Sequence, residues 1–151
     1  MISSFDERRN EFKPYGLTCE LWSPSLMRKP DRHNEIEINY FPEEGITYLF
    51  QGRKVVAPPR RLTVFWGLVP HQIIDFEKAN PYYVCTVPFS LFLEWKLSTA
   101  FVDSLLKGEV IFEDKEENSN YDEFLFKNWL NDINGNGSTE IALLEIHARL
   151  S

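Results

Sequence analysis

An alternation of polar and apolar residues between Arg32 and Tyr40 is the feature that most constrains the fold of this chain. A period of two residues is the signature of a β-strand whose two faces meet different surroundings. A solvated polar face is the simplest interpretation of such a strand. The apolar positions are Ile36, Ile38 and Tyr40, and the polar positions are His33, Glu35, Glu37 and Asn39.

Further short β-prone runs surround this strand, and turn signals separate them at intervals of roughly 8 to 12 residues. Pro42–Gly45, Gln51–Gly52 and Asn80–Pro81 are such signals. No pattern of helical length interrupts the runs, which argues against a parallel α/β fold. The expected strands are 17–22, 33–41, 46–50, 53–57, 62–66, 71–76 and 82–87. The sequence therefore predicts a mainly β fold, either a sandwich or a barrel.

The periodicity changes after the last of these strands. Short helices are predicted near 90–107, with Ser98 capping the second of them, and a late strand is predicted over 109–113. Two longer helices follow, one capped by Asn120 and running to Ile133, the other capped by Ser138 and running to the end of the chain. They form an αα-hairpin across the turn at residues 134–137.

The last helix carries a wide apolar stripe that contains Ile141, Leu144 and Ala148. Two interpretations stay open on the residues alone. The stripe either packs onto the β-structure or forms a dimer interface, where helices bury such stripes against each other.

Five segments, in this order and spacing, carry a resemblance to a known family. The chain from about residue 18 to about residue 150 resembles the cupin-type sensor half of AraC-type transcription regulators. The resemblance implies a cupin-like β-barrel, a double-stranded β-helix or jelly roll, over residues 16–113. It also implies a flexible arm over 1–15 and a helical dimerisation segment over 114–151. The segments are 33–39, 48–50, 62–66, 70–72 and 87–95.

The family implies a non-catalytic domain that binds a small-molecule effector, here expected to be a mono- or disaccharide. It implies a homodimer formed through the stripe of Ile141, Leu144 and Ala148. The net charge of −7 and the pI near 5.0 oppose contact with a phosphate backbone. We therefore expect DNA to be bound only by a helix-turn-helix domain that lies outside this chain. The polar N-terminus and the lack of long apolar runs favour a cytoplasmic protein without membrane contact.

Polar side chains of the alternating strand suit the hydroxyls of a sugar, and aromatic rings suit its C–H faces. Trp66 is the best candidate for stacking on the sugar, although packing in the core explains it equally well. Cys19 and Cys85 are expected to be buried free thiols. The predicted ligand-binding residues are His33, Glu35, Glu37, Asn39, Tyr48, Trp66 and His71.

The same residue types also suit a metal, although the resemblance implies a sensor that works without a metal or another cofactor. If a metal is bound, its ligands are expected to be His33, Glu37 and His71, with Asp31 as a possible fourth. The alternative function is then a stand-alone metal-dependent cupin enzyme of the isomerase or dioxygenase type.

Overall fold

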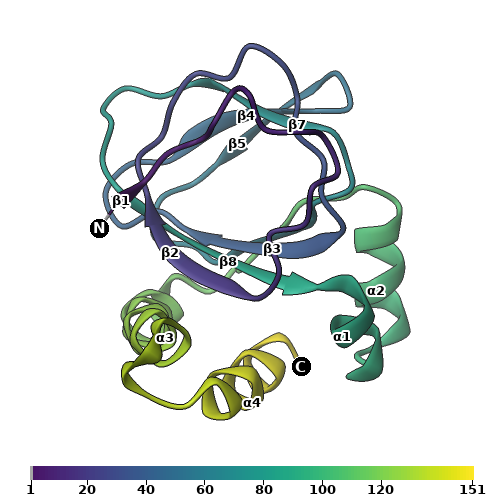
Figure 1. Ribbon diagram of the computed structural model, residues 1–151, viewed down its shortest axis with the longest axis vertical. Coiled ribbons are helices and arrows are strands. Elements are labelled where there is room, and N and C mark those ends of the chain that lie inside the picture. Colours follow the sequence, from purple (N-terminus) through teal and green to yellow (C-terminus); the bar gives the residue numbers. More distant parts are fainter. Residues whose placement is uncertain (1) are drawn as a thin grey trace.

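Nine strands form two sheets in the computed structural model, which describes residues 2–151 except the side chain of Asn136. The large sheet has the order β1-β2-β8-β3-β6-β9, and the small sheet has the order β5-β4-β7. The two sheets face each other across a space that we call the lumen (Figure 1). The strands are β1 (Ile2–Ser3), β2 (Thr18–Trp22), β3 (Glu35–Tyr40), β4 (Ile46–Phe50), β5 (Arg53–Ala57), β6 (Thr63–Trp66), β7 (His71–Asp75), β8 (Tyr82–Pro88) and β9 (Ile111–Phe112).

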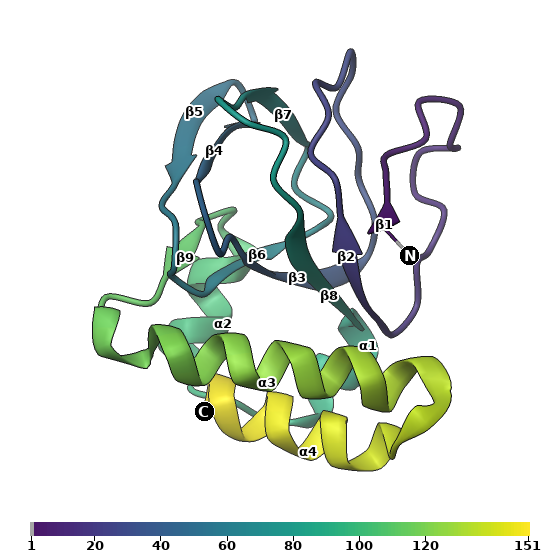
Figure 2. The same cartoon turned by 90° about the vertical axis from the view of Figure 1, so that its left-hand side faces the viewer.

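The helices lie outside the lumen, on the other side of the large sheet, and α3 and α4 run next to each other there (Figure 2). The side chains of Ser98 and Ser138 cap α2 and α4, as predicted. The helices are α1 (Phe89–Glu94), α2 (Thr99–Leu106), η1 (Glu116–Asn118), α3 (Ser119–Asn131), η2 (Asp132–Asn136) and α4 (Thr139–Leu150). No helix within residues 2–151 is long and apolar enough to cross a membrane.

The central strand β3 is buried on both faces. Ile36, Ile38 and Tyr40 belong to the apolar core beneath the helices, which also contains Phe126 and Trp129 of α3. The opposite face of β3 turns Glu37 and Asn39 toward the lumen, where Tyr48 meets them. The simplest interpretation of the polar face, a solvated surface, is therefore wrong, because Asn39 and its neighbours are buried.

The expectation of a closed cupin-like barrel is not confirmed. Within residues 2–151 the strands pair in two separate sheets, and a single isolated bridge between Asp31 and His71 adds to these ladders. Long connections between strands explain the open edges, since the segments 23–34 and 76–81 form no regular ladder. The mainly β class and the C-terminal helices are confirmed.

One predicted helix start and the length of one predicted strand are wrong. The helix expected to begin after Asn120 begins at Ser119, and no side chain caps it, so the expected capping box is not formed. The late strand is reduced to Ile111–Phe112. The predicted strands 46–50 and 53–57 are confirmed with the same bounds. Gln51 and Gly52 between them both adopt the positive φ that a tight hairpin turn requires. Cys19 and Cys85 are free and buried, as predicted.

Candidate ligand-binding site in the lumen

The candidate site is built around the imidazole of His33, which is fully buried. Its two ring nitrogens each meet a carboxylate: Nδ1 lies 3.0 Å from Oε1 of Glu35, and Nε2 lies 3.0 Å from Oε1 of Glu37. The ring packs directly on the backbone of Gly67, where an added Cβ would come within 2.2 Å of it. Only glycine at residue 67 allows this close approach.

Glu35 faces away from the open part of the lumen and anchors His33. Its Oε2 accepts hydrogen bonds from the backbone N–H groups of Tyr15 and Gly16, and its Oε1 accepts one from His33. Both oxygens of the Glu35 carboxylate therefore have hydrogen-bond partners. The structure therefore places Glu35 behind the ring it holds and outside the cavity described below, although the sequence predicts it as a ligand-binding residue.

Glu37, Asn39 and Tyr48 form a hydrogen-bonded row on the lumen side of the large sheet. The side-chain N–H₂ of Asn39 donates to Oε2 of Glu37 at 3.0 Å and to the hydroxyl of Tyr48 at 2.9 Å. The Oδ1 atom of Asn39 is buried and has no hydrogen-bond partner among the described residues. A buried acceptor without a partner is rare in native proteins and indicates that a donor is missing.

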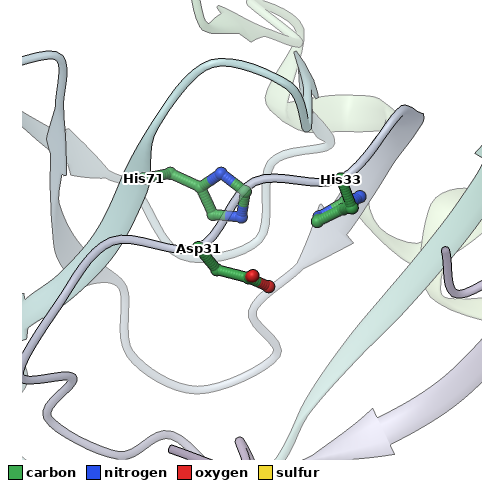
Figure 3. A group of neighbouring side chains, drawn as sticks. All are labelled: Asp31, His33 and His71. Atoms are coloured by element: carbon green, nitrogen blue, oxygen red, sulfur yellow. The ribbon is translucent and has the colours of Figure 1, made fainter. Parts of the chain in front are cut away.

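His71 enters the cluster from the small sheet (Figure 3). Its Nδ1–H donates to the carbonyl of Val69 at 2.8 Å, which leaves Nε2 without a proton. The Nε2 atom lies 3.9 Å from Oε1 of Glu37, beyond hydrogen-bonding distance. The rings of His33 and His71 meet edge to face, with their centroids 5.1 Å apart. We call Asp31, His33, Glu35, Glu37 and His71 the lumen cluster.

Burial and charge act in opposite directions on the two imidazoles. Burial disfavours the charged ring of His33, but the hydrogen bonds to Glu35 and Glu37 outweigh it and raise the pKa of His33 to about 9. Burial lowers the pKa of His71, and the nearby charge of His33 lowers it further. Burial raises the pKa of Glu37, but its contacts with the two histidines lower it more. Near neutral pH the cluster therefore contains ionised Glu37, a protonated His33 and a neutral His71.

The N-terminal segment of residues 2–16, which we call the arm, closes one side of the cluster. Arg9 forms an ion pair with Asp31, with Nε 3.3 Å from Oδ2, and both side chains are almost fully buried. The hydroxyl of Tyr15 donates to the same oxygen at 3.2 Å. The guanidinium of Arg9 also lies over the ring of Tyr15, 4.2 Å from its centroid.

A cavity of about 50 Å³ lies between the arm and the lumen cluster. This volume holds a few water molecules and is smaller than a typical pocket for a small organic ligand. Phe5 and Tyr15 of the arm form part of its wall, so the arm fills space that a larger guest would need. Among the residues that line it are Asp31, Glu37, Tyr48, His71, Tyr82 and Thr86.

Trp66 does not lie in the lumen. Its register partner on β3 is Ile36, which points toward the helices, and its indole stacks on Phe89 with the centroids 4.9 Å apart. The indole N–H donates to Oδ1 of Asn34. Of the two interpretations of Trp66, the structure favours packing over a place in the lumen.

Sequence reasoning did not select Phe5, Arg9, Tyr15, Tyr82 or Thr86 for the site. The arm that contains Arg9 and Tyr15 has no periodicity, so nothing in its sequence indicates which residue it covers. Tyr82 and Thr86 lie on β8 with the same parity, and β8 is paired with β3. The alternation along β8 is the signal that could have identified them.

Comparison with known proteins gives relatives for part of the chain. The chain is similar to the melibiose operon regulatory protein. The protein of Escherichia coli strain K12 is 27% identical over 95 residues, which is 63% of this chain and 32% of that protein. The protein of the same name from Escherichia coli O6:H1 matches equally well. The chain thus spans about a third of the length of these curated relatives. No family model matches the chain.

A solved structure shares the fold. The crystal structure of apo ToxT K231A from Vibrio cholerae superposes with a TM-score of 0.58 at 4% sequence identity. The match covers 91% of this chain and 54% of the ToxT chain. At this identity the likeness concerns the fold alone. It includes nearly the whole chain, so the β-structure and the helices beneath it occur together in both proteins.

Proposed function

We propose that this chain is the effector-binding domain of an AraC-type transcription regulator and that it has no catalytic role. The observation that carries the proposal is the sequence similarity to the melibiose operon regulatory protein. The fold that the chain shares with ToxT supports it. In this proposal DNA is contacted by another part of the protein, since this acidic chain repels phosphate groups.

The effector, in this proposal, is a neutral mono- or disaccharide bound in the lumen. The carboxylates of Asp31 and Glu37 line the cavity, and their charge disfavours anionic ligands. Glu37 and Tyr48 line the cavity, and Asn39 behind them, with its unpaired Oδ1, is within reach of a guest once they shift. Tyr48 and Tyr82 offer aromatic surface. A saccharide is larger than the present cavity, so it binds only after Phe5 and Tyr15 move aside.

A thermal-shift screen tests the proposal. A ligand at about ten times its Kd stabilises the native state by about 1.4 kcal/mol, which raises the Tm of a domain of this size by about 3 to 6 °C. We expect such a shift with at least one mono- or disaccharide at millimolar concentration, among α-galactosides, β-galactosides and pentoses. Unchanged melting curves with all of them would contradict saccharide binding.

Two asparagines provide a matched pair of variants for this screen. Asn39→Ala removes the unpaired acceptor in the lumen and should abolish the shift. Asn34→Ala removes the partner of Trp66 on the far side of the sheet and should leave the shift intact. Equal loss in both variants would place the saccharide outside the lumen.

The domain, in this proposal, dimerises through α4. Ile141 and Leu144 are 53% and 68% exposed, and Ala148 on the same stripe is exposed as well, while Ala142 and Ile146 supply the packing of this helix. Leu144→Glu should convert dimers to monomers in sedimentation experiments. Leu93→Glu, at a similarly exposed leucine on α1, should leave the dimer unchanged.

A further inference from the structure

We propose that the cavity between the arm and the lumen cluster binds a primary ammonium group, such as that of a small amine or an amino sugar. The carboxylates of Asp31 and Glu37 line this cavity together with the imidazole of His71. Among the described residues that line it there is no lysine or arginine. The proposal names a ligand class that neutral saccharides do not include, and it does not depend on regulation of transcription.

The charges of the lumen cluster favour one added positive charge. Asp31, Glu35 and Glu37 bring three carboxylates to it. The described ion pairs set two cations against them, the guanidinium of Arg9 and the ring of His33. Even with this ring counted as protonated, one negative charge remains in a buried region. A single ammonium balances that charge, whereas an anion would add to it.

Three acceptors are placed to receive the three N–H bonds of a primary ammonium. They are the carboxylates of Asp31 and Glu37 and the Nε2 atom of His71, whose proton is on Nδ1. Acceptors around one ammonium lie about 4 to 4.6 Å apart, because each is about 2.8 Å from its nitrogen.

The observed spacing of these acceptors agrees with that geometry. Oε1 of Glu37 lies 3.9 Å from Nε2 of His71, and the ligand atoms of Asp31 and His71 lie within 4.8 Å of each other. In Figure 3 the side chains of Asp31 and His71 point toward one common space. The acceptors therefore surround a position that suits an ammonium nitrogen.

Aromatic rings form another part of the wall. The arm and three strands each contribute one ring, namely Tyr15, Trp22 of β2, Tyr48 of β4 and Tyr82 of β8. These elements lie on different sides of the lumen (Figure 1). The face of an aromatic ring attracts a cation, and proteins hold ammonium ligands between several such rings. The same contact occurs beside the cavity, where the guanidinium of Arg9 lies over the ring of Tyr15.

The size of the cavity suits an ammonium head better than a whole sugar ring. Its volume of about 50 Å³ is the space of a few water molecules, which an ammonium with one attached methyl group can fill. Phe5 and Tyr15 can therefore stay in place when so small a ligand binds. A larger amine puts its head between the acceptors and needs the arm to move only for the rest of the molecule.

Titration with methylammonium chloride, followed through the amide chemical shifts, tests the proposal. We expect saturable shifts at Asp31, Glu37 and His71 below about 100 mM, because so small a ligand binds weakly. Sodium chloride at the same concentrations controls for ionic strength and should give no saturable shift at these residues. The proposal is overturned if methylammonium gives no saturable shift there, or if sodium chloride gives the same one.

Substitutions locate the ammonium. Asp31→Asn and Glu37→Gln each remove a charge and keep the size of the side chain, and each should weaken methylammonium binding by about 10-fold or more. Tyr82→Leu removes one ring of the wall and should weaken it by about 3- to 10-fold. Asp75→Asn removes an exposed carboxylate from the strand that contains His71 and should leave binding unchanged. Unaltered affinity in both Asp31→Asn and Glu37→Gln would contradict the assignment.

A measurement on the unsubstituted protein guards against variants that do not fold. We expect nuclear Overhauser effects between the methyl protons of bound methylammonium and the ring protons of Tyr48 and Tyr82, since both rings line the cavity. Effects that involve only residues outside the cavity would show binding elsewhere and overturn the proposal.

Three sugars separate this proposal from saccharide binding as such. Galactosamine carries an ammonium where galactose carries a hydroxyl, and N-acetylgalactosamine carries a neutral amide at the same position. We expect galactosamine to bind at least about 10-fold more tightly than the other two. Equal affinities of galactosamine and galactose would overturn the ammonium site. Binding of methylammonium without binding of any sugar would support it and contradict saccharide binding.

Discussion

Two buried ionic clusters of this molecule differ in how completely their charges are paired. One is the lumen cluster between the sheets. The other, which we call the helix-side cluster, joins Glu113, Asp122 and Arg149 beneath the large sheet. Arg149 makes a two-pronged contact with Asp122, with Nε 2.6 Å from Oδ1 and Nη2 3.1 Å from Oδ2, and it also contacts Glu113.

The helix-side cluster is saturated. Glu113 accepts further hydrogen bonds from the backbone of Lys115 and the side chain of Asn118, and the side chain of Asp122 is 1% exposed. The lumen cluster, in contrast, keeps the lone pair of His71 Nε2 free and has an unpaired acceptor next to it on Asn39. The charges of the helix-side cluster are thus paired with one another, whereas the lumen cluster has polar atoms left for contact with a guest.

The largest expected effect comes from removing the central cation of the helix-side cluster. Arg149→Met leaves two buried carboxylates facing each other without compensation, and we expect the free energy of unfolding to fall by about 3 kcal/mol. Urea unfolding at neutral pH measures it. Lys127→Met, at an exposed pair with Glu123, should cost less than about 0.5 kcal/mol. A loss for Arg149→Met as small as that of the control would remove the distinction between the clusters.

Saccharide binding should survive in the same variant below its lowered melting point, because the described contacts of Arg149 are with Asp122 and Glu113 and not with the lumen cluster. Loss of lumen binding in well-folded Arg149→Met would show that the two clusters are coupled through the large sheet.

The sequence shows the strand at the centre of the site but not how its faces are used. The alternation of Ile36, Ile38 and Tyr40 with Glu37 and Asn39 identified the strand and its two sides. It did not show that both sides are buried, because the helices that cover one side are far away in the sequence. Parity along one strand also carries no information about the register of its neighbours. For this reason Trp66 was assigned to the lumen side, although its pairing with Ile36 places it under the helices.

The sequence also does not predict contacts that involve segments without periodicity. Glu35 and Glu37 have the same parity, and only the approach of Tyr15 and Gly16 turns Glu35 into an anchor for His33. Asp122 and Arg149 are separated by 27 positions, and in the sequence each resembles an ordinary surface charge. Their contact depends on how α3 and α4 dock, which helical patterns do not specify.

An arginine-to-methionine substitution in the lumen cluster should lower the stability less than Arg149→Met does. Arg9→Met breaks the ion pair with Asp31, but Asp31 keeps its hydrogen bond from Tyr15 and faces the cavity, where water can solvate it. We expect a loss of about 1 kcal/mol, since water compensates part of the lost contact. Hydrogen exchange should also become faster at the amides of Tyr15 and Gly16 and stay slow in β3.

The outcome for Arg9→Met decides what the arm does. Faster exchange at Tyr15 with a small loss of stability means that the arm is a removable cover of the cavity. A loss as large as that of Arg149→Met would mean that the lumen cluster is part of the scaffold, and its unpaired atoms would then say nothing about a guest.

The last expected effect is a pH dependence of the helix-side cluster. Burial works against the carboxylate of Glu113, but the hydrogen bond from Arg149 outweighs it and lowers the pKa of Glu113 to about 2. The pKa in the folded state is thus below the ordinary value of 4.5, so ionised Glu113 stabilises the fold above that pH. This contribution is lost as the pH falls from about 4.5 toward about 2.

Urea unfolding of the unsubstituted chain and of Glu113→Gln at a series of pH values measures this contribution. The stability difference between the two proteins should be constant above about pH 5 and should shrink steadily below it. In the Arg149→Met background the largest cause of the lowered pKa is gone and only the hydrogen bonds from Lys115 and Asn118 remain, so the difference should vary much less with pH in this range. If it shrinks to the same extent in both backgrounds, Arg149 is not what holds Glu113 ionised, and the helix-side cluster is less tightly paired than its geometry indicates.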